Sequence, residues 1–305
     1  MILAAIDIGS NGIRLQIIRV IKDGNKVSFK KLEYIRFPLG LGRSVFKTGR
    51  ISAAIRDKFL KLLRTFQLLM ELYEVEAYLA TATSAMREAK NSKKVIALVQ
   101  EELGLEIKII PGKKEALILS KAVLSTINDD VSSYAHIDVG GGSTEINIYV
   151  GKIRIHSRSF KIGTVRNLKA GERKDILKEM KSWVAKCTKD VRRPITCIGT
   201  GGNIKKLFNL SNKQQHGGIS LSELKGMKGY LDEFSYKERV HVLKLNPDRA
   251  DVIIPAVKIY IDVMKMIKSD HILVPSIGLK DGLLFHLYEQ IENKNFEEVE
   301  FVEMY

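Results

Sequence analysis

The sequence predicts an α/β protein with two lobes of similar topology, each a mixed sheet flanked by helices. Its length of 305 residues is that of two ordinary domains. A glycine-rich motif occurs twice, at residues 7–12 and 138–145. After each copy, strand and helix patterns follow in the same order, which is typical of layered α/β domains.

The two glycine motifs are copies of one pattern. Residues 6–18 read I-D-I-G-S-N-G-I-R-L-Q-I-I, and residues 137–149 read I-D-V-G-G-G-S-T-E-I-N-I-Y. Aligned, they match at Ile6/Ile137, Asp7/Asp138 and Gly9/Gly140. The spacing between the copies is too long for a solenoid repeat, so it predicts a duplicated domain.

In the first half, the motif joins two strand patterns and a third strand follows. Apolar patterns predict strands over residues 3–8, 13–20, 26–37, 75–80 and 106–110. Amphipathic patterns predict helices over residues 52–73, 92–103 and 113–127, the first with a serine cap. Because this glycine turn opens a hairpin, it differs from a dinucleotide-binding fingerprint, whose turn opens a helix.

The second half repeats this order. Strands are expected over residues 134–139, 145–150, 152–160, 195–199 and 271–274. Helices are expected over residues 172–190, 203–210, 221–231, 251–268 and 279–293. A polar gap at residues 128–130 places the domain boundary there. We therefore expect one lobe over residues 1–127 and another over 128–305, with the last helix free to pack back on the first lobe.

The composition indicates a folded, basic protein. Lysine and arginine outnumber aspartate and glutamate by 50 to 35, and apolar residues make up 45% of the chain, which excludes a disordered chain. No apolar run reaches the roughly 18 residues of a membrane helix, and the N-terminus lacks a basic leader. With only Cys187 and Cys197, a disulfide framework is excluded. We expect a cytoplasmic protein without a membrane partner.

The net charge of +15 favours a polyanionic partner. Polyphosphate, a highly phosphorylated nucleotide, nucleic acid and a membrane surface are the classes that such a charge attracts. A basic surface that serves only solubility explains the charge equally well.

The first motif, D-I-G-S-N-G at residues 7–12, can form a turn that binds phosphate. Gly9 and Gly12 allow a tight turn whose N–H groups make an anion-binding nest. Asp7 ends the strand, where its carboxylate could hold Mg²⁺. Taken alone, the motif is better explained as an ordinary hairpin with Asn-Gly at its tip.

The second motif, D-V-G-G-G-S-T-E at residues 138–145, is a stronger indication of phosphate binding. Three consecutive glycines lose more chain entropy than a plain hairpin requires. They allow close approach to an anion, while Asp138 and Glu145 offer hard oxygen ligands for Mg²⁺. Because the motif occurs twice at matched positions, we predict that both turns bind phosphate, facing each other across a cleft.

Three further loops each follow a strand and open a helix. I-G-T-G-G-N at residues 198–203 suits either an anion at the helix N-terminus or close packing. T-A-T-S-A-M-R at residues 81–87 ends in Arg87, either a phosphate ligand or a surface residue. P-G-K-K-E-A at residues 111–116 places Glu115 in a first helical turn, where a carboxylate can activate water or merely suit the helix dipole.

Other catalytic patterns are missing from the sequence. The six histidines show no metal-ligand spacing such as H-E-x-x-H. There is no G-x-S-x-G nucleophile elbow and no Walker A motif. The common zinc-hydrolase, serine-hydrolase and P-loop classes are therefore excluded.

Taken together, the motifs resemble those of the exopolyphosphatase / guanosine pentaphosphate phosphatase family, in the superfamily of actin, sugar kinases and heat-shock chaperones. The five motifs above are joined in the expected order by R-A-D-V-I-I-P-A at 249–256 and G-L-K-D-G-L-L at 278–284. The resemblance implies two ribonuclease-H-like lobes with a cleft between them, and Mg²⁺-dependent hydrolysis of a terminal phosphoanhydride. It leaves a homodimer open, and we expect no nucleic-acid partner.

The resemblance also implies roles for single residues. Glu115 looks like the base for the attacking water, and Arg87 like the arginine that faces the phosphate. Asp7, Asp138 and Glu145 look like the acidic residues around Mg²⁺. The expected substrate-binding residues are Ser10, Asn11, Gly12, Arg14, Gly140, Gly141, Gly142, Ser143, Thr144 and Gly201. Basic residues expected to hold the rest of a phosphate chain are Arg14, Arg43, Lys161 and Arg166.

The chain departs from the family pattern at a few positions. Gly12 stands where the family usually has serine, and Lys113 and Lys114 stand where glutamates are common. Lys280 and Asp281 replace a common Arg-Glu pair. None of these changes removes an expected catalytic carboxylate.

We expect an exopolyphosphatase that hydrolyses the terminal phosphate of inorganic polyphosphate by Mg²⁺-assisted attack of water. A guanosine pentaphosphate 5′-phosphohydrolase would use the same residues and stays open, although the charge favours the longer polyanion. An ATP-dependent kinase and a non-enzymatic sensor of a phosphorylated ligand, both on the same fold, are further alternatives.

Overall fold

The computed structural model describes residues 1–24, 26–125, 127, 131–211, 217–294, 296 and 299–302. The chain forms two compact units, one comprising Met1–Ser125 and the segment from Gly278 onward, the other Thr126–Ile277. The boundary expected between residues 127 and 128 adjoins residues 128–130, which lie outside the described residues. The last helix belongs to the first unit.

The first unit contains a six-stranded mixed sheet in the order β12-β3-β2-β1-β4-β5. Its strands are β1 (Ile2–Ile8), β2 (Ile13–Asp23), β3 (Lys26–Phe37), β4 (Ala77–Ala82), β5 (Ile107–Ile109) and β12 (Glu300–Val302). β1, β4 and β5 are parallel, whereas β2 is antiparallel to β1 and β3. The carboxyl ends of β1, β4 and β5 therefore meet at one edge of the sheet.

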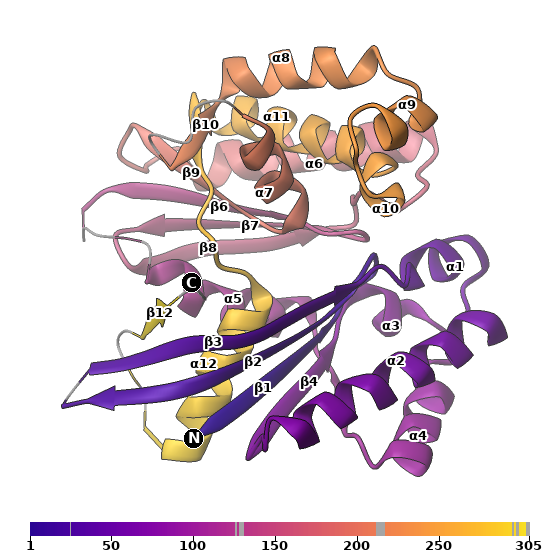
Figure 1. Cartoon of the computed structure of the whole chain (residues 1–305). Coiled ribbons are helices and arrows are strands. Elements are labelled where there is room, and N and C mark those ends of the chain that lie inside the picture. The colour runs from indigo at the N-terminus through magenta and orange to yellow at the C-terminus, as the bar shows by residue number, and fades with distance from the viewer. Residues whose placement is uncertain are drawn as a thin grey trace. The chain divides into compact units, whose positions relative to one another are not determined.

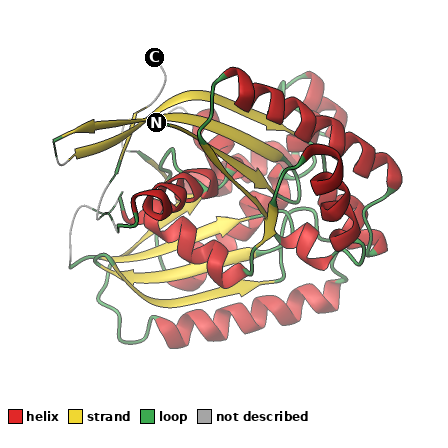
Figure 2. Cartoon of the chain, turned by 90° about the horizontal axis from the view of Figure 1, so that it is seen from below, coloured by secondary structure: helices red, strands yellow, loops and turns green. Residues whose placement is uncertain are grey.

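Helices cover both faces of this sheet (Figures 1 and 2). They are α1 (Leu41–Thr48), α2 (Ala53–Leu72), α3 (Ser84–Glu88), α4 (Ser92–Leu103), α5 (Gly112–Leu124) and α12 (Leu279–Glu292). On one face, Ile6 and Leu15 pack in a core with Phe59 and Phe66 of α2. Each such side chain contributes about 2 kcal/mol when fully buried.

The opposite face of the first sheet has an apolar part and a polar part. Leu3 of β1 and Ile18 of β2 pack with Leu283 and Leu284 of α12. α12 lies along the strands, drawn in yellow in Figure 1. Toward the carboxyl end of β1, the same face carries Asp7 in place of an apolar residue, since side chains alternate along a strand. A polar site thus begins where the apolar core ends.

The second unit contains a six-stranded sheet in the order β10-β11-β9-β6-β7-β8. Its strands are β6 (Ser133–Val139), β7 (Thr144–Val150), β8 (Ile153–Phe160), β9 (Ile195–Thr200), β10 (Gly218–Ser220) and β11 (His271–Leu273). Its helices are α6 (Ala170–Cys187), α7 (Gly202–Leu210), α8 (Leu221–Asp232), α9 (Tyr236–His241), α10 (Pro247–Ala250) and α11 (Ile253–Ile267). Its core includes Val257 and Met264 of α11, both fully buried.

The two sheets share one topology. β3-β2-β1-β4-β5 in the first unit corresponds to β8-β7-β6-β9-β11 in the second, with the same sequence of antiparallel and parallel pairs. The register also agrees, because Asp7 lies opposite Thr81 as Asp138 lies opposite Thr200. The prediction of two mixed α/β lobes is confirmed.

Most predicted elements form within a few residues of their expected bounds. The strand expected over residues 26–37 is β3, and the helix expected over 92–103 is α4. Ser52 caps α2 as predicted, its Oγ accepting the N–H of Ile55 at 3.4 Å. The short elements α1, α3, α9, α10, β10 and β12 were not predicted. Among the described residues, no helix is both long enough and apolar enough to cross a bilayer.

Candidate active site

The two glycine turns close in the same way. In the first unit, the N–H of Gly9 donates to the carbonyl of Gly12 at 3.2 Å. In the second, the N–H of Gly140 donates to the carbonyl of Ser143 at 2.9 Å. These are matched positions of the repeat, so the duplication seen in the sequence extends to the hydrogen bonding of the turns.

A second loop holds the first turn through its carbonyl groups. Gly42 N–H donates to the Ser10 carbonyl at 2.7 Å, and Gly40 N–H donates to the Asn11 carbonyl at 3.1 Å. On the other side, the hydroxyls of Ser10 and Ser84 are hydrogen-bonded at 2.7 Å. The turn is therefore fixed between the start of α1 and the start of α3.

The loop after β8 holds the second turn in the same manner. Three donors reach the three glycine carbonyls: Thr164 N–H to Gly140 (3.1 Å), Val165 N–H to Gly141 (2.9 Å) and Arg166 Nε to Gly142 (2.7 Å). Gly163 is required for this contact, since a Cβ there would lie 2.4 Å from the Gly141 oxygen. A turn whose carbonyl groups are hydrogen-bonded to a loop on one side can direct its N–H groups to the other side.

The two units differ in the residue that faces the strand-end aspartate. Asp7 lies opposite Arg14, and its Oδ2 accepts a charge-assisted hydrogen bond from Arg14 Nη1 at 2.5 Å. In the second unit, Asp138 lies opposite Glu145 instead. Glu145 is buried, and its Oε1 accepts a hydrogen bond from Ser159 at 2.7 Å. One unit thus carries a neutralised acid, and the other carries two adjacent acids.

Arg87 and Glu115 meet at the carboxyl edge of the first sheet. Arg87 lies in the last turn of α3, which follows β4, and Glu115 lies in the first turn of α5, which follows β5. Arg87 Nη1 lies 3.5 Å from Glu115 Oε2 and donates to the carbonyl of Ile110 at 2.6 Å. Since β1 ends at the same edge, both side chains share that edge with the first glycine turn.

Tyr260 of α11 is hydrogen-bonded to the strand ends next to Asp138. Its buried hydroxyl donates to the Thr200 carbonyl at 2.6 Å and accepts the N–H of Val139 at 3.4 Å. Burial and the negative charges of Asp138 and Glu145 raise the pKa of Tyr260 well above its usual value. The tyrosine therefore stays neutral and ties the end of β6 to the end of β9.

Gly201 allows the ends of β6 and β9 to lie close together. It has a positive φ of 98°, and a Cβ there would lie 2.9 Å from Asp138 Oδ1. Any side chain would therefore displace the carboxylate. This places Gly201, expected as a substrate-binding residue, directly beside Asp138.

A buried histidine lies one row behind the acidic pair. His136 Nε2 is hydrogen-bonded to the Thr200 hydroxyl at 2.8 Å, and its Nδ1 to Asn147 Nδ2 at 3.1 Å. Complete burial lowers the pKa of His136 to about 3. The imidazole is therefore neutral at physiological pH and serves the packing of the sheet beneath Asp138.

The expected site residues fall into two sets, one in each unit. Those of the first unit lie at the carboxyl edge of β1, β4 and β5: Asp7, Ser10, Asn11, Gly12, Arg14, Arg87 and Glu115. Those of the second unit lie at the carboxyl edge of β6 and β9: Asp138, Gly140, Gly141, Gly142, Ser143, Thr144, Glu145 and Gly201. Thr144 is fully buried, and its hydroxyl donates to the carbonyl of Ile162 at 2.6 Å.

Sequence reasoning missed several residues that shape the site. Tyr260 and His136 carried no motif, and their roles arise from distant strand and helix pairings. The loops that hold the turns did leave a signal, because Gly40 and Gly163 each follow the end of a third strand by a few residues. Comparing the two halves beyond the hairpin could have found them.

The donor set of the second unit fits Mg²⁺. This ion is commonly held by one or two carboxylates together with waters and substrate phosphates. Asp138 and Glu145 supply two adjacent carboxylates. In the part of the chain that the structure describes, no group of three or more His, Cys, Asp or Glu is gathered for a metal. Two carboxylates fit Mg²⁺ only as a partial ligand set, which waters and substrate oxygens would complete.

The fold and the site define a two-unit mixed α/β protein with a glycine turn and a strand-end aspartate in each unit. The chain belongs to the Ppx/GppA phosphatase family, whose sequence profile matches residues 18–291. The resemblance seen in the motifs is thus confirmed.

Two curated relatives cover nearly all of this chain. A bifunctional 3-dehydroquinate synthase/phosphatase of Fusobacterium nucleatum is 29% identical over 95% of the chain and 47% of the relative. A guanosine-5′-triphosphate,3′-diphosphate pyrophosphatase of Photobacterium profundum is 24% identical over 97% of the chain and 61% of the relative. The chain therefore spans about half to three fifths of the length of these relatives.

Solved structures match the whole chain. The crystal structure of the Aquifex aeolicus member of the Ppx/GppA family has a TM-score of 0.72 at 27% identity, covering 97% of this chain and 99% of that one. An exopolyphosphatase of Cytophaga hutchinsonii has a TM-score of 0.79 at 22% identity, with the same coverage of both chains. The second match supports the fold alone.

Proposed function

We propose that this protein is an exopolyphosphatase, which removes the terminal phosphate of inorganic polyphosphate by Mg²⁺-assisted attack of water. The observation that carries this proposal is the meeting of Arg87 and Glu115, 3.5 Å apart, at the strand edge where the first glycine turn lies. A carboxylate for water and a guanidinium for phosphate in one place suit hydrolysis of a phosphoanhydride.

In this proposal Glu115 orients the attacking water. The water oxygen bonds to the terminal phosphorus, the anhydride P–O bond breaks, and Glu115 accepts the proton that the water loses. Arg87 binds the phosphate oxygens, where negative charge gathers in the transition state. Its hydrogen bond to the Ile110 carbonyl fixes the arginine before substrate arrives.

Each glycine turn binds a phosphoryl group through backbone N–H groups. The bonds from Gly40 and Gly42 hold the first turn by its carbonyls, and the loop at residues 163–166 does the same for the second. A turn fixed in this way pays little ordering entropy on binding, because its backbone is already in place. Ser143 and Asn11 add polar side chains to these turns.

Asp138 and Glu145 hold Mg²⁺ in this proposal. When bound, Mg²⁺ neutralises the charge on the phosphate oxygens and favours departure of the leaving group. Ser159 orients Glu145, and Tyr260 holds the strand end that carries Asp138. Asp7, expected from the motif as a further magnesium ligand, would contact the ion through water, since its Oδ2 is bonded to Arg14.

The charge of the chain favours a long polyanion as substrate. A net charge of +15 raises the local concentration of polyphosphate and makes binding depend on salt. Arg14, Arg43, Lys161 and Arg166 are the basic residues that we assign to the chain beyond the terminal phosphate.

A second candidate substrate is guanosine pentaphosphate, with loss of its 5′-terminal phosphate. The relative from Photobacterium profundum, named for this class of nucleotide, favours it at 24% identity over 97% of the chain. The bond broken and the residues proposed are the same for both substrates. The two candidates differ only in what is bound beyond the reacting phosphate.

A phosphate-release assay decides between these candidates. Purified protein is incubated with long-chain polyphosphate, guanosine pentaphosphate or ATP, each with and without Mg²⁺. We expect Mg²⁺-dependent release from polyphosphate at the highest kcat/KM. Preference for the guanosine nucleotide would select the second candidate, and turnover of ATP alone would reject both. Tight binding of all three without release would identify a sensor.

A further inference from the structure

A second arginine reaches the first glycine turn from β3. A Cβ placed on Gly12 would lie 3.2 Å from both Nε and Nη2 of Arg36, and 3.2 Å from the carbonyl oxygen of Phe37. Gly12 does not have a positive φ, so its backbone does not demand glycine. A side chain at Gly12 would therefore press on both the Arg36 guanidinium and the Phe37 carbonyl, which places the guanidinium next to the turn.

Arg36 is the outer member of a row of charged residues across the sheet. The register places Asp7 opposite Arg14 on β1 and β2, and Arg14 opposite Arg36 on β2 and β3. Like charges directly opposite each other destabilise an antiparallel pair. Asp7 is bonded to Arg14, so the row brings two guanidinium groups and one carboxylate together beside the turn.

The next row of the same face is balanced. Gln16 lies opposite Tyr34, and its Nε2 donates to Asp281 Oδ1 at 2.8 Å. Lys280 is paired with the other oxygen of Asp281 at 2.6 Å, and its Nζ lies 5.4 Å from the centre of the Tyr34 ring. This row therefore pairs its lysine with an aspartate of α12, whereas the row beside the turn carries two arginines and one aspartate.

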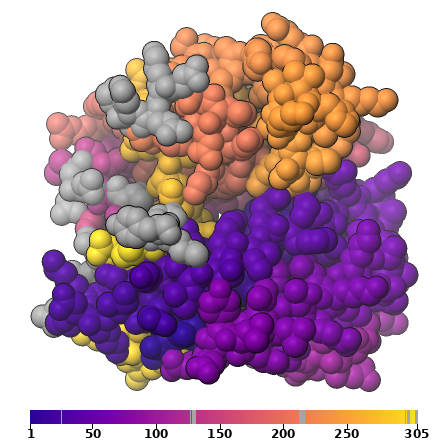
Figure 3. Space-filling view, viewed as in Figure 1, coloured from indigo at the N-terminus to yellow at the C-terminus, as the bar shows by residue number. Residues whose placement is uncertain are grey.

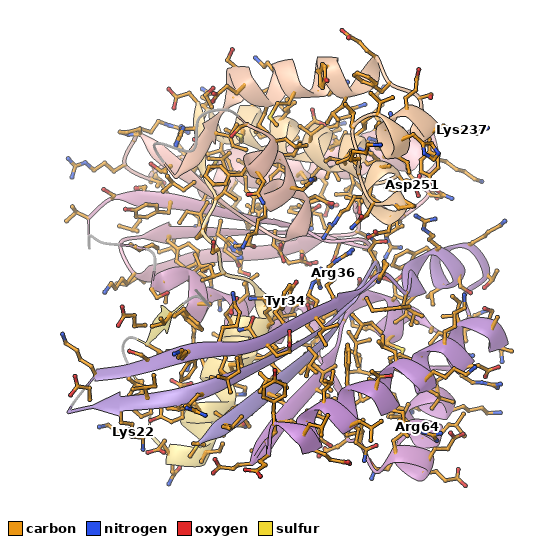
Figure 4. All side chains as sticks on the ribbon, viewed as in Figure 1. Lys22, Tyr34, Arg36, Arg64, Lys237 and Asp251 are labelled. Atoms are coloured by element: carbon orange, nitrogen blue, oxygen red, sulfur yellow. The ribbon has the colours of Figure 1, made fainter. Side chains whose placement is uncertain are left out.

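Arg36 lies within reach of a ligand at the turn. Figure 4 shows Tyr34 and Arg36 on the same strand, β3. Residues near the N-terminus, seen in indigo, form part of the molecular surface in Figure 3. The Arg36 side chain is half-buried, so its stem is ordered by packing while the head group borders the turn.

We propose that Arg36 is an additional phosphate-binding residue, which contacts the phosphoryl group held by the first glycine turn. This inference rests on the proposed function and deepens it. A guanidinium donates two parallel hydrogen bonds to phosphate oxygens and keeps its charge at every working pH. Because it touches the turn already, it can bind the ligand without moving the backbone.

The test measures tripolyphosphate binding by titration calorimetry, with every variant in a Glu115→Gln background to prevent turnover. Arg36→Ala should weaken binding at least ~10-fold, the loss expected for a charge-assisted hydrogen bond. Arg36→Lys, which keeps the charge but not the fork, should recover part of that loss. Arg64→Ala is the matched control, because Arg64 is an exposed arginine of α2 with 63% of its side chain accessible.

A second measurement uses the contact between Gly12 and Arg36. Gly12→Ala adds only the Cβ that would press on the guanidinium, so it should weaken binding in the wild-type background. It should have less effect in the Arg36→Ala background, where the neighbour is gone. Equal effects in both backgrounds would mean that the turn itself, rather than Arg36, is disturbed, and would count against the proposal.

The inference and the proposed function fail in different ways. If Arg36→Ala binds tripolyphosphate as tightly as Arg64→Ala does, the role of Arg36 is wrong, whatever the wild-type enzyme hydrolyses. If wild-type protein releases no phosphate from any substrate but Arg36→Ala still loses binding, the inference stands and the proposed reaction falls. Should Arg36→Ala not fold, as judged by circular dichroism, Arg36→Gln against Arg36→Lys decides the same question.

Discussion

Asp7 and Arg14 face each other across β1 and β2 with Oδ2 and Nη1 2.5 Å apart, whereas the matched residues of the second unit are both acidic. The duplicated scaffold therefore carries different chemistry in its two copies. The first pairs its aspartate with a cation, and the second leaves Asp138 beside Glu145. The matched positions thus combine an acid with a base in the first unit and two acids in the second.

The pair in the first unit should contribute to stability. Asp7→Asn removes the charge from a buried acceptor and weakens its bond to Arg14, so we expect a loss of about 1–3 kcal/mol in the free energy of unfolding. Urea unfolding measures it. Asp57→Asn is the control, since Asp57 pairs with Arg56 on the exposed surface of α2. That change should cost less than about 1 kcal/mol, and equal losses in both variants would show that the Asp7 pair contributes no more than an exposed pair.

The acidic pair of the second unit should control the need for magnesium. Glu145→Gln keeps the size of the side chain and its contact with Ser159 but removes one negative charge. We expect the Mg²⁺ concentration for half-maximal phosphate release to rise at least ~10-fold. The control is Glu179→Gln, a change at an exposed position of α6, which should leave this Mg²⁺ concentration unchanged. An unchanged Mg²⁺ requirement in Glu145→Gln would show that Glu145 does not bind the metal.

Glu115 should matter for turnover and little for binding. Glu115→Gln retains the shape of the side chain but cannot accept a proton, so kcat should fall by at least ~10² while KM changes little. The control is Glu101→Gln, an exposed glutamate of α4. Circular dichroism should show the same fold for both. A kcat close to that of wild type in Glu115→Gln would require another base.

The hairpins and their neighbours were predictable because their signals are local. A period-two pattern identified most of β2, and the repeat identified both turns and their aspartates. The helix α3 escaped notice because its five residues are too short to show a period. α1 begins after Gly40 in the left-handed region, without a side-chain cap, so it lacks the usual start signal.

The rest of the site depends on contacts between distant parts of the chain. Tyr260 reaches the end of β6 from α11, and Gln16 is bonded to Asp281 of α12. Arg36 meets Gly12 only because β2 and β3 pair in one register. A single sequence carries no direct record of such pairings. Motifs therefore predicted which residues have suitable chemistry, and the fold determined which of them touch.

The buried histidine should make the protein sensitive to acid. The pKa of His136 is lowered to about 3 in the folded protein, against 6.5 in the unfolded chain. Below the unfolded pKa, the unfolded chain binds a proton that the folded protein does not, so this contribution is complete above pH 6.5 and is lost as the pH falls toward 3. Between about pH 7.5 and about pH 5, the loss should be about 2 kcal/mol.

Urea unfolding at several pH values, with His136→Gln as the reference, isolates this effect. Glutamine can still hydrogen-bond to the Thr200 hydroxyl but does not titrate, so the variant should be less stable at neutral pH and show a flatter decline with acid. Carboxylates change the free energy of unfolding equally in wild type and His136→Gln. Their contribution therefore cancels when one curve is subtracted from the other. Parallel curves for the two proteins would mean that His136 becomes protonated in the folded state. That outcome would mean that the folded protein admits a proton to His136, although its side chain is fully buried.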